Sequence, residues 1–123
     1  MIFVLSVAVL ILIGCGILKD EDMVEASIPG TYIRFSKHEY GTEYDTLVIT
    51  LQNEVAKEYR ILRKWKYERV IDNTPMETEY KRSVTSGIYN TEHKLLQEIS
   101  GDLYSFDVKG KLLFNGPIQY QKL

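Results

Sequence analysis

The stretch that decides the fold is DTLVITLQ, residues 45–52. Aliphatic and polar side chains alternate along it, and successive side chains of a β-strand point to opposite faces of a sheet. Leu47, Ile49 and Leu51 therefore share one face, which we expect to be buried. This is the clearest strand signal in the chain, and it predicts a sheet with one face against a core.

From Pro29 onward, the chain repeats this pattern in short segments separated by turn signals, which is typical of an all-β domain. A polar connection containing Gly41 is expected between the first two segments, over residues 38–44. The later segments are separated by only a few residues, and connections of that length join antiparallel neighbours. Strands are predicted at 31–37, 45–52, 79–89, 94–99, 103–108, 111–114 and 118–122.

Residues 53–71 fit two patterns. Val55, Tyr59 and Leu62 lie at helical spacing, whereas Tyr59, Ile61 and Trp65 lie on one face of a strand. The aromatic content and the turn signals on both sides favour the strand and a long hairpin arm. The prediction is an antiparallel meander of about eight strands, closed or half-closed into a barrel so that its edges are hidden.

Composition fits one domain and limits its partners. The chain has 123 residues with 15 basic and 17 acidic side chains, a net charge of −2. Non-specific nucleic-acid binding needs a strong positive field, so no nucleic-acid partner is expected. The single cysteine, Cys15, excludes both a disulfide framework and a cysteine-built zinc site.

The first 14 residues differ from the rest, because 12 of them are apolar. They end in Leu12-Ile13-Gly14-Cys15, which resembles the bacterial lipobox. The resemblance implies that residues 1–14 are a lipoprotein signal peptide and that Cys15 carries fatty acyl chains such as palmitate, which anchor the protein to a membrane. The alternative is an uncleaved anchor helix that runs on to Leu18.

Behind the cysteine, Lys19-Asp20-Glu21-Asp22 is similar to the surface-export signal of lipoproteins from Bacteroidota. That resemblance implies a lipid-anchored protein of the outer membrane, exposed on its outer leaflet. A solvated tether that anionic membranes repel is the alternative interpretation. Residues 15–28 are expected to be the lipidated cysteine and an acidic, flexible tether, and residues 29–123 the β-barrel-like domain.

The body also resembles the small lipocalin-like lipoproteins of Bacteroidota, which implies a lipocalin-like barrel or half-barrel. The residues that carry this resemblance are Pro29-Gly30-Thr31-Tyr32, Asp45-Thr46-Leu47, Trp65 and Tyr67 leading into Val70-Ile71-Asp72, and the segment LLFNGPIQY at 112–120.

The sequence carries no familiar catalytic motif. No Gly-x-Ser-x-Gly elbow occurs, and the one cysteine belongs to the leader. His38 and His93 are 55 positions apart and fit no metal-binding motif, although a shared cleft would favour a hydrolase. We expect no enzyme, no cofactor and no metal.

The most unusual segment is 59–69, in which five cations and three aromatic side chains share 11 residues. On a strand, Arg63, Trp65, Tyr67 and Arg69 lie on one face, where guanidinium groups between rings suit a planar, sugar or anionic ligand. The alternative is that both aromatics are core and both arginines snorkel or pair with carboxylates of neighbouring strands.

These features predict a lipid-anchored, non-enzymatic binding module for a small apolar, glycan or peptide ligand held by Trp65, Tyr67, Arg63 and Arg69. A structural lipoprotein that docks a larger envelope complex through an exposed edge strand, without a pocket, is the alternative.

Overall fold

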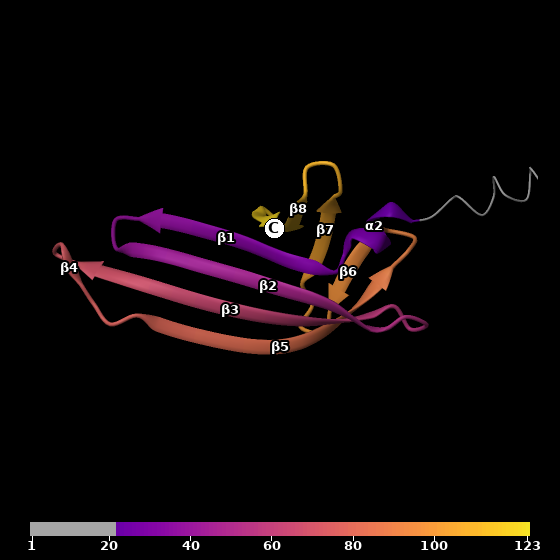
Figure 1. Ribbon diagram of the computed structural model, residues 1–123, viewed down its shortest axis with the longest axis horizontal. Coiled ribbons are helices and arrows are strands. Elements are labelled where there is room, and N and C mark those ends of the chain that lie inside the picture. Colours follow the sequence, from indigo (N-terminus) through magenta and orange to yellow (C-terminus); the bar gives the residue numbers. More distant parts are fainter. Residues whose placement is uncertain (1–21) are drawn as a thin grey trace, which may run out of the picture.

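The computed structural model describes residues 22–123 and has an all-β body (Figure 1). Nine strands form one antiparallel meander, and eight of them close into a barrel because β1 pairs with both β2 and β9. The predicted fold class is therefore confirmed. The signal peptide predicted at 1–14, Cys15 and most of the tether lie outside the described residues.

The strands follow each other in sequence order around the barrel, apart from β4, a two-residue strand beside the end of β3. Their bounds are β1 Gly30–His38, β2 Gly41–Asn53, β3 Glu58–Ile71, β4 Thr74–Pro75, β5 Glu79–Asn90, β6 Leu95–Glu98, β7 Leu103–Asp107, β8 Leu112–Asn115 and β9 Ile118–Lys122.

Unequal strand lengths give the molecule two parts. Strands β1, β2, β3 and β5 have 9 to 14 residues, whereas β6 to β9 have only 4 or 5. The short strands can cover only one end of the long ones. Residues 34–38, 41–45, 63–71 and 79–85 therefore project beyond the barrel as a four-stranded sheet, called the arm below (Figure 1).

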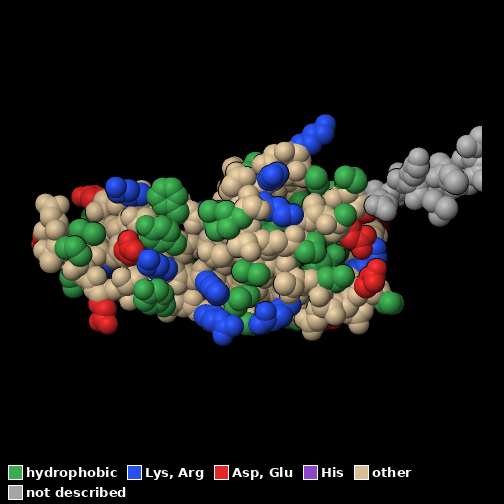
Figure 2. Space-filling view, viewed as in Figure 1, with side chains coloured by type: hydrophobic (Ala, Val, Ile, Leu, Met, Phe, Trp, Pro, Cys, Tyr) green, Lys and Arg blue, Asp and Glu red, His purple; other side chains and the backbone are tan. Residues whose placement is uncertain are grey.

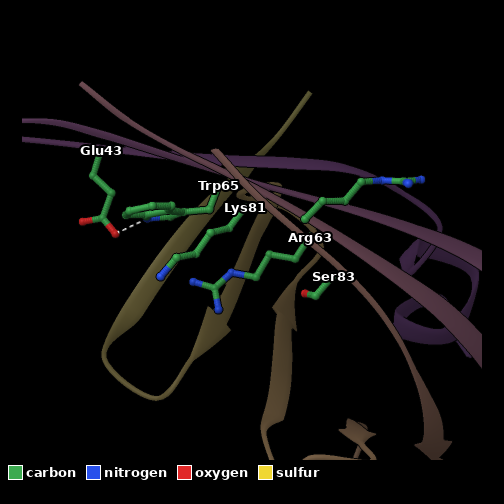
Figure 3. A pocket seen from close by; sticks show the side chains of 6 residues that line it. Glu43, Arg63, Trp65, Lys81 and Ser83 are labelled. Carbon is green, nitrogen blue, oxygen red and sulfur yellow. Dashed lines mark hydrogen bonds between the residues drawn. The ribbon is translucent and has the colours of Figure 1, made fainter. Parts of the chain in front are cut away.

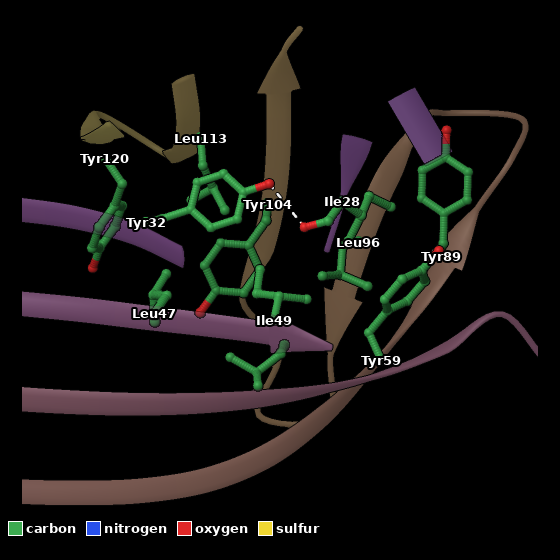
Figure 4. Packing of buried hydrophobic residues seen from close by; sticks show 11 residues of the cluster. Ile28, Tyr32, Leu47, Ile49, Tyr59, Tyr89, Leu96, Tyr104, Leu113 and Tyr120 are labelled. Atoms are coloured by element: carbon green, nitrogen blue, oxygen red, sulfur yellow. Dashed lines mark hydrogen bonds between the residues drawn. The ribbon is translucent and has the colours of Figure 1, made fainter. Parts of the chain in front are cut away.

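The barrel interior is filled by side chains, as in other small barrels (Figure 4). Five tyrosines contribute their rings, and each of four hydroxyls donates a hydrogen bond to a carbonyl or carboxylate oxygen, so the rings are buried without leaving a polar group unpaired. The cluster consists of Ile28, Tyr32, Leu47, Ile49, Tyr59, Ile61, Tyr89, Leu96, Tyr104, Leu113 and Tyr120.

Within the ambiguous segment, the strand interpretation is confirmed over Glu58–Ile71, after a turn at 54–57. The polar connection expected over 38–44 is wrong, because β2 begins at Gly41 and its residues 41–45 pair with β1. A Cβ at Gly41 would collide with the backbone carbonyl of Glu68, and its φ of +149° also favours glycine. The glycine therefore lets β2 begin close against β3 rather than opening a loop.

The body also begins earlier than the boundary expected at Pro29. Helix α2, Met23–Ser27, is capped by Asp22, whose side chain accepts hydrogen bonds from the N–H groups of Val24 and Glu25. The side chain of Ile28 is fully buried in the core. The last part of the expected flexible tether is thus folded onto the barrel.

Between residues 22 and 123, no helix has the length and apolar character needed to cross a membrane.

Candidate functional site

All four residues predicted for the ligand site lie on β3, on the face of the arm that continues the barrel interior; this is called the inner face below. Cross-strand pairing places Arg63 opposite Leu47 and Ser83, and Trp65 opposite Asp45 and Lys81. An open hollow of about 650 Å³ lies on this face (Figure 3). Its lining residues are Glu43, Arg63, Trp65, Lys81, Arg82 and Ser83.

Arg63 joins the hollow to the barrel core through the buried carboxylate of Asp45. Arg63 donates two hydrogen bonds to that carboxylate, from Nε at 3.0 Å and from Nη2 at 2.6 Å. The hydroxyl of Tyr120 donates a third at 2.9 Å, and Asp45 is only 2 % exposed. The hydrogen bonds to Asp45 raise the pKa of Arg63, so its charge is held in place against Asp45.

Trp65 stands half-buried between neighbours rather than inside the core. Its Nε1 donates a hydrogen bond of 2.5 Å to Glu43 Oε1, and Tyr67 stacks on it with ring centroids 5.7 Å apart. The ammonium of Lys81 lies 4.9 Å from the centre of the indole ring, a cation–π contact that leaves the lysine charge exposed. One ring therefore connects the strands β2, β3 and β5 across the inner face.

Tyr67 and Arg69 continue the row toward the tip of the arm. His38 stacks on Tyr67 with ring centroids 5.9 Å apart, and the Arg69 guanidinium lies 5.5 Å from the centre of the same ring. Arg69 also forms an ion pair with Glu79 at 3.4 Å. Tyr67 and Arg69 do not line the hollow, whereas Arg63 and Trp65 do.

The alternative interpretation of this segment is realised in part. The two arginines pair with carboxylates of neighbouring strands, Asp45 on β2 and Glu79 on β5, as the alternative expected. The two aromatic side chains are half-buried on the arm, where solvent reaches them, and are not core residues.

Sequence reasoning missed the contribution of β5 to the site. Lys81, Arg82 and Ser83 line the hollow, but their strand carries no long alternating apolar pattern near them. The adjacent basic pair is the signal that could have singled them out. The buried roles of Asp45 and Glu98 were also missed, because nothing in the local sequence specifies which tyrosines cross the barrel to meet them.

Glu98 is the second buried carboxylate, with 8 % exposure. The hydroxyls of Tyr104 and Thr85 donate hydrogen bonds to it at 2.5 and 2.6 Å. Burial, and then the hydrogen bond to Glu98, raise the pKa of Tyr104 above its ordinary value. This cluster ties β5, β6 and β7 together inside the barrel.

The outer face of the arm carries a second hollow, of about 480 Å³. Apolar, basic and some acidic side chains lie on the visible face of the arm in Figure 2. Four cations and no carboxylate line this hollow, and within residues 22–123 Lys64, Lys81 and Arg82 form no salt bridge. Its lining residues are Tyr44, Thr46, Lys64, Trp65, Lys66, Tyr80, Lys81 and Arg82.

The two histidines are not brought together. His38 ends β1 at the tip of the arm, and His93 lies in the turn between β5 and β6 at the other end of β5. In the described part of the chain, no group of three His, Cys, Asp or Glu side chains is arranged to hold a metal ion. The shared cleft that would have favoured a hydrolase is therefore not formed.

Comparison of the chain with protein-family models, curated proteins and solved structures finds no match.

Proposed function

We propose that this protein is a lipid-anchored, non-enzymatic binding module of the cell envelope, and that it takes its ligand in the inner-face hollow beside Trp65. The observation that carries the proposal is the position of the hollow. Side chains fill the barrel, so space for a ligand lies on the arm, where Trp65 and Lys81 stay open to solvent. Open aromatic and cationic groups around a hollow suit recognition of a ligand rather than core packing.

Two side chains of the hollow, Arg63 and Trp65, are held in place by carboxylates. Glu43 accepts from Trp65, and Arg63 is held by Asp45. These contacts fix the orientation of the indole and guanidinium groups before a ligand arrives, which lowers the entropy lost on binding.

Fluorescence of the single tryptophan tests the site. Glycans, fatty acids and peptides are titrated into the folded protein, and at least one class is expected to shift the Trp65 emission. Lys81→Ala should weaken that binding about tenfold because it removes the cation beside the indole. Lys109→Ala, which changes an exposed lysine in a distant turn, is the matched control. The proposal fails if no class perturbs Trp65, or if both variants bind as the unchanged protein does.

The lipid anchor rests on the lipobox-like sequence before Cys15. Mass spectrometry of the protein purified from bacterial envelopes should find residues 1–14 removed and acyl chains on Cys15, since two or more chains are needed for durable anchoring. Cys15→Ser should release the protein from the membrane fraction. An intact leader with an unmodified thiol would contradict the anchor without affecting the proposed binding site.

A structural role in a larger envelope complex is the second candidate, and one observation favours it. Large aromatic side chains on the outer face of the arm are exposed, with Phe35 at 66 % and Tyr80 at 72 %. Exposed apolar side chains grouped on one face are typical of protein interfaces. Crosslinking in intact cells would support this role if one envelope protein dominates the products and no small ligand shifts Trp65.

A further inference from the structure

We infer that the ligand of this module is an extended acidic polypeptide segment that joins the sheet as an added strand along the free edge of β5. This inference rests on the proposed function and specifies it, because the hollow beside Trp65 then forms one side of the peptide site. Such strand addition takes affinity from main-chain hydrogen bonds and specificity from pockets for alternate side chains.

The free edge results from the unequal strand lengths. β5 pairs with β3 from Glu79 to Ile88, but its other side pairs with β6 only from Gly87 to Asn90. Among the described residues, 22–123, none forms a strand ladder with residues 79–86 on that side. Residues 79–86 contain no proline, and no helix of that part of the chain covers this edge, although its positive charge discourages pairing with a neutral or basic strand.

The backbone groups that face outward can be identified from one hydrogen bond. The carbonyl of Ser86 accepts from the N–H of Ile99 at 3.0 Å, so the backbone of residue 86 points away from β3. In an antiparallel strand this direction alternates with each residue. Tyr80, Arg82 and Val84 therefore present their N–H and C=O groups to an incoming strand.

Hollows lie on both faces of the sheet along this edge. The inner hollow includes Lys81 and Ser83, and the outer hollow includes Tyr80 and Arg82. A third hollow of about 640 Å³ extends along Val84, Thr85 and Ser86. Side chains of an added strand would alternate between the two faces of the sheet. Those on the inner face and those on the outer face would each lie beside a hollow.

The positive charge around the outer hollow favours an acidic peptide segment as the ligand. Lys64, Lys66 and Arg82 belong to the outer face and line the outer hollow, which has no carboxylate among its lining residues. Lys66 pairs with Glu68, whereas Lys64 and Arg82 form no salt bridge within residues 22–123. Acidic side chains of the added strand would fit there, and Tyr44 and Tyr80 supply aromatic contact. On the inner face, apolar side chains would lie against Trp65, which makes the indole a reporter for the peptide.

The test uses a synthetic peptide of about ten residues in which glutamate alternates with valine, matching the length of an ordinary strand. It is expected to shift the Trp65 emission. The same peptide with lysine in place of glutamate should bind at least tenfold more weakly. A third version, methylated on alternate backbone nitrogens, should also bind at least tenfold more weakly because it loses ladder donors.

Val84→Pro is the decisive variant. It removes an outward N–H without removing a bond to β3, since the ladder with β3 uses the odd-numbered residues. Binding of the Glu/Val peptide should fall at least tenfold, and it should fall less in Val84→Ala, which loses side-chain contact with the third hollow but keeps the outward N–H. Arg82→Glu should also weaken binding at least tenfold, with Lys109→Glu as the charge-matched control. Circular dichroism and urea unfolding confirm that each variant is folded.

The outcomes separate this inference from the proposed function. If a glycan or fatty acid shifts Trp65 and the Glu/Val peptide does not, the binding module stands and strand addition is overturned. Strand addition is also overturned if the peptide binds Val84→Pro as well as it binds Val84→Ala. If no probe of any class shifts Trp65, both proposals fail.

Discussion

At the residue scale, the inner face depends on one ion pair that connects the arm with the barrel. Asp45 is buried, and its charge is balanced by Arg63 and one tyrosine hydroxyl. A buried carboxylate that loses its cation is costly, whereas an exposed pair contributes little. Arg63 and Arg69 therefore have unequal roles, although both are paired with a carboxylate.

Arg63→Ala should lower the free energy of unfolding by about 2 kcal/mol, because it leaves the Asp45 charge buried with one partner. The arginine is itself half exposed, which keeps the loss below that of a fully buried pair. Arg69→Ala, the control on the same strand face, should cost less than about 0.5 kcal/mol since its pair with Glu79 is exposed. Urea unfolding followed by circular dichroism measures the free energy of unfolding of both variants. Equal losses of stability would contradict the unequal roles of the two ion pairs.

At the element scale, the arm consists of long strands that no second layer covers within the part of the chain that the structure describes, residues 22–123. Its four strands are held by ladder hydrogen bonds and by side-chain rows across each face. Two of them also have free edges, β1 beyond its short contact with β9 and β5 before its contact with β6. The arm is therefore the part of the molecule where local opening should be least costly.

Hydrogen exchange followed by NMR should reveal the free edge of β5. Amides of Tyr80, Arg82 and Val84 face outward and should exchange rapidly, whereas those of Lys81 and Ser83 bond to β3 and should be protected. The alternation between rapid and slow amide exchange should disappear from residue 87 onward, because there β6 pairs with the other side of β5. Uniform exchange over 80–84 would contradict the assigned backbone directions.

Gly41→Ala should destabilise the protein by more than about 1 kcal/mol, because a Cβ there meets the backbone of β3 and the φ is unfavourable. Gly116→Ala is the control: its φ is also positive, but an added Cβ finds no atom within 4 Å. It should cost about 1 kcal/mol from backbone strain alone. Thermal unfolding compares the two variants, and a smaller loss at Gly41 would show that β2 can move away from β3.

At the scale of the whole molecule, tyrosines replace many of the aliphatic side chains of an ordinary barrel core. Their rings fill the interior, and their hydroxyls reach Asp22, Asp45 and Glu98 or the backbone of Ile28. Burial raises the pKa of Tyr32 to about 12, and the pKa values of Tyr89, Tyr104 and Tyr120 also rise, first through burial and then through nearby carboxylates.

Because these tyrosines are buried in the core, the folded protein should lose stability at alkaline pH. A tyrosine whose pKa is raised by folding keeps its proton more tightly in the folded state, so its contribution is complete below the unfolded pKa of about 10. It is lost as the pH rises toward the folded value, about 12 for Tyr32. Unfolding free energy should therefore fall from about pH 10 to about pH 12. Urea unfolding at stepped pH measures this fall.

Tyrosine absorbance at 295 nm provides the check. The buried tyrosines should ionise above the ordinary tyrosine range, together with loss of the β-sheet signal. Tyr40→Phe should leave the stability profile unchanged, whereas Tyr104→Phe should alter it. Ionisation of all tyrosines in one step near their ordinary pKa, with the sheet intact, would contradict the buried network.

The sequence by itself determined the all-β class, the approximate positions of eight of the nine strands and the antiparallel order, because alternation with a period of two and short turns are local signals. It also placed Arg63, Trp65, Tyr67 and Arg69 on one face of β3. Tertiary structure alone decided that β2 begins at Gly41, that Asp45 meets Tyr120 across 75 residues, and that β5 has a free edge. These features depend on how strands of unequal length close around a filled core, which no local pattern specifies.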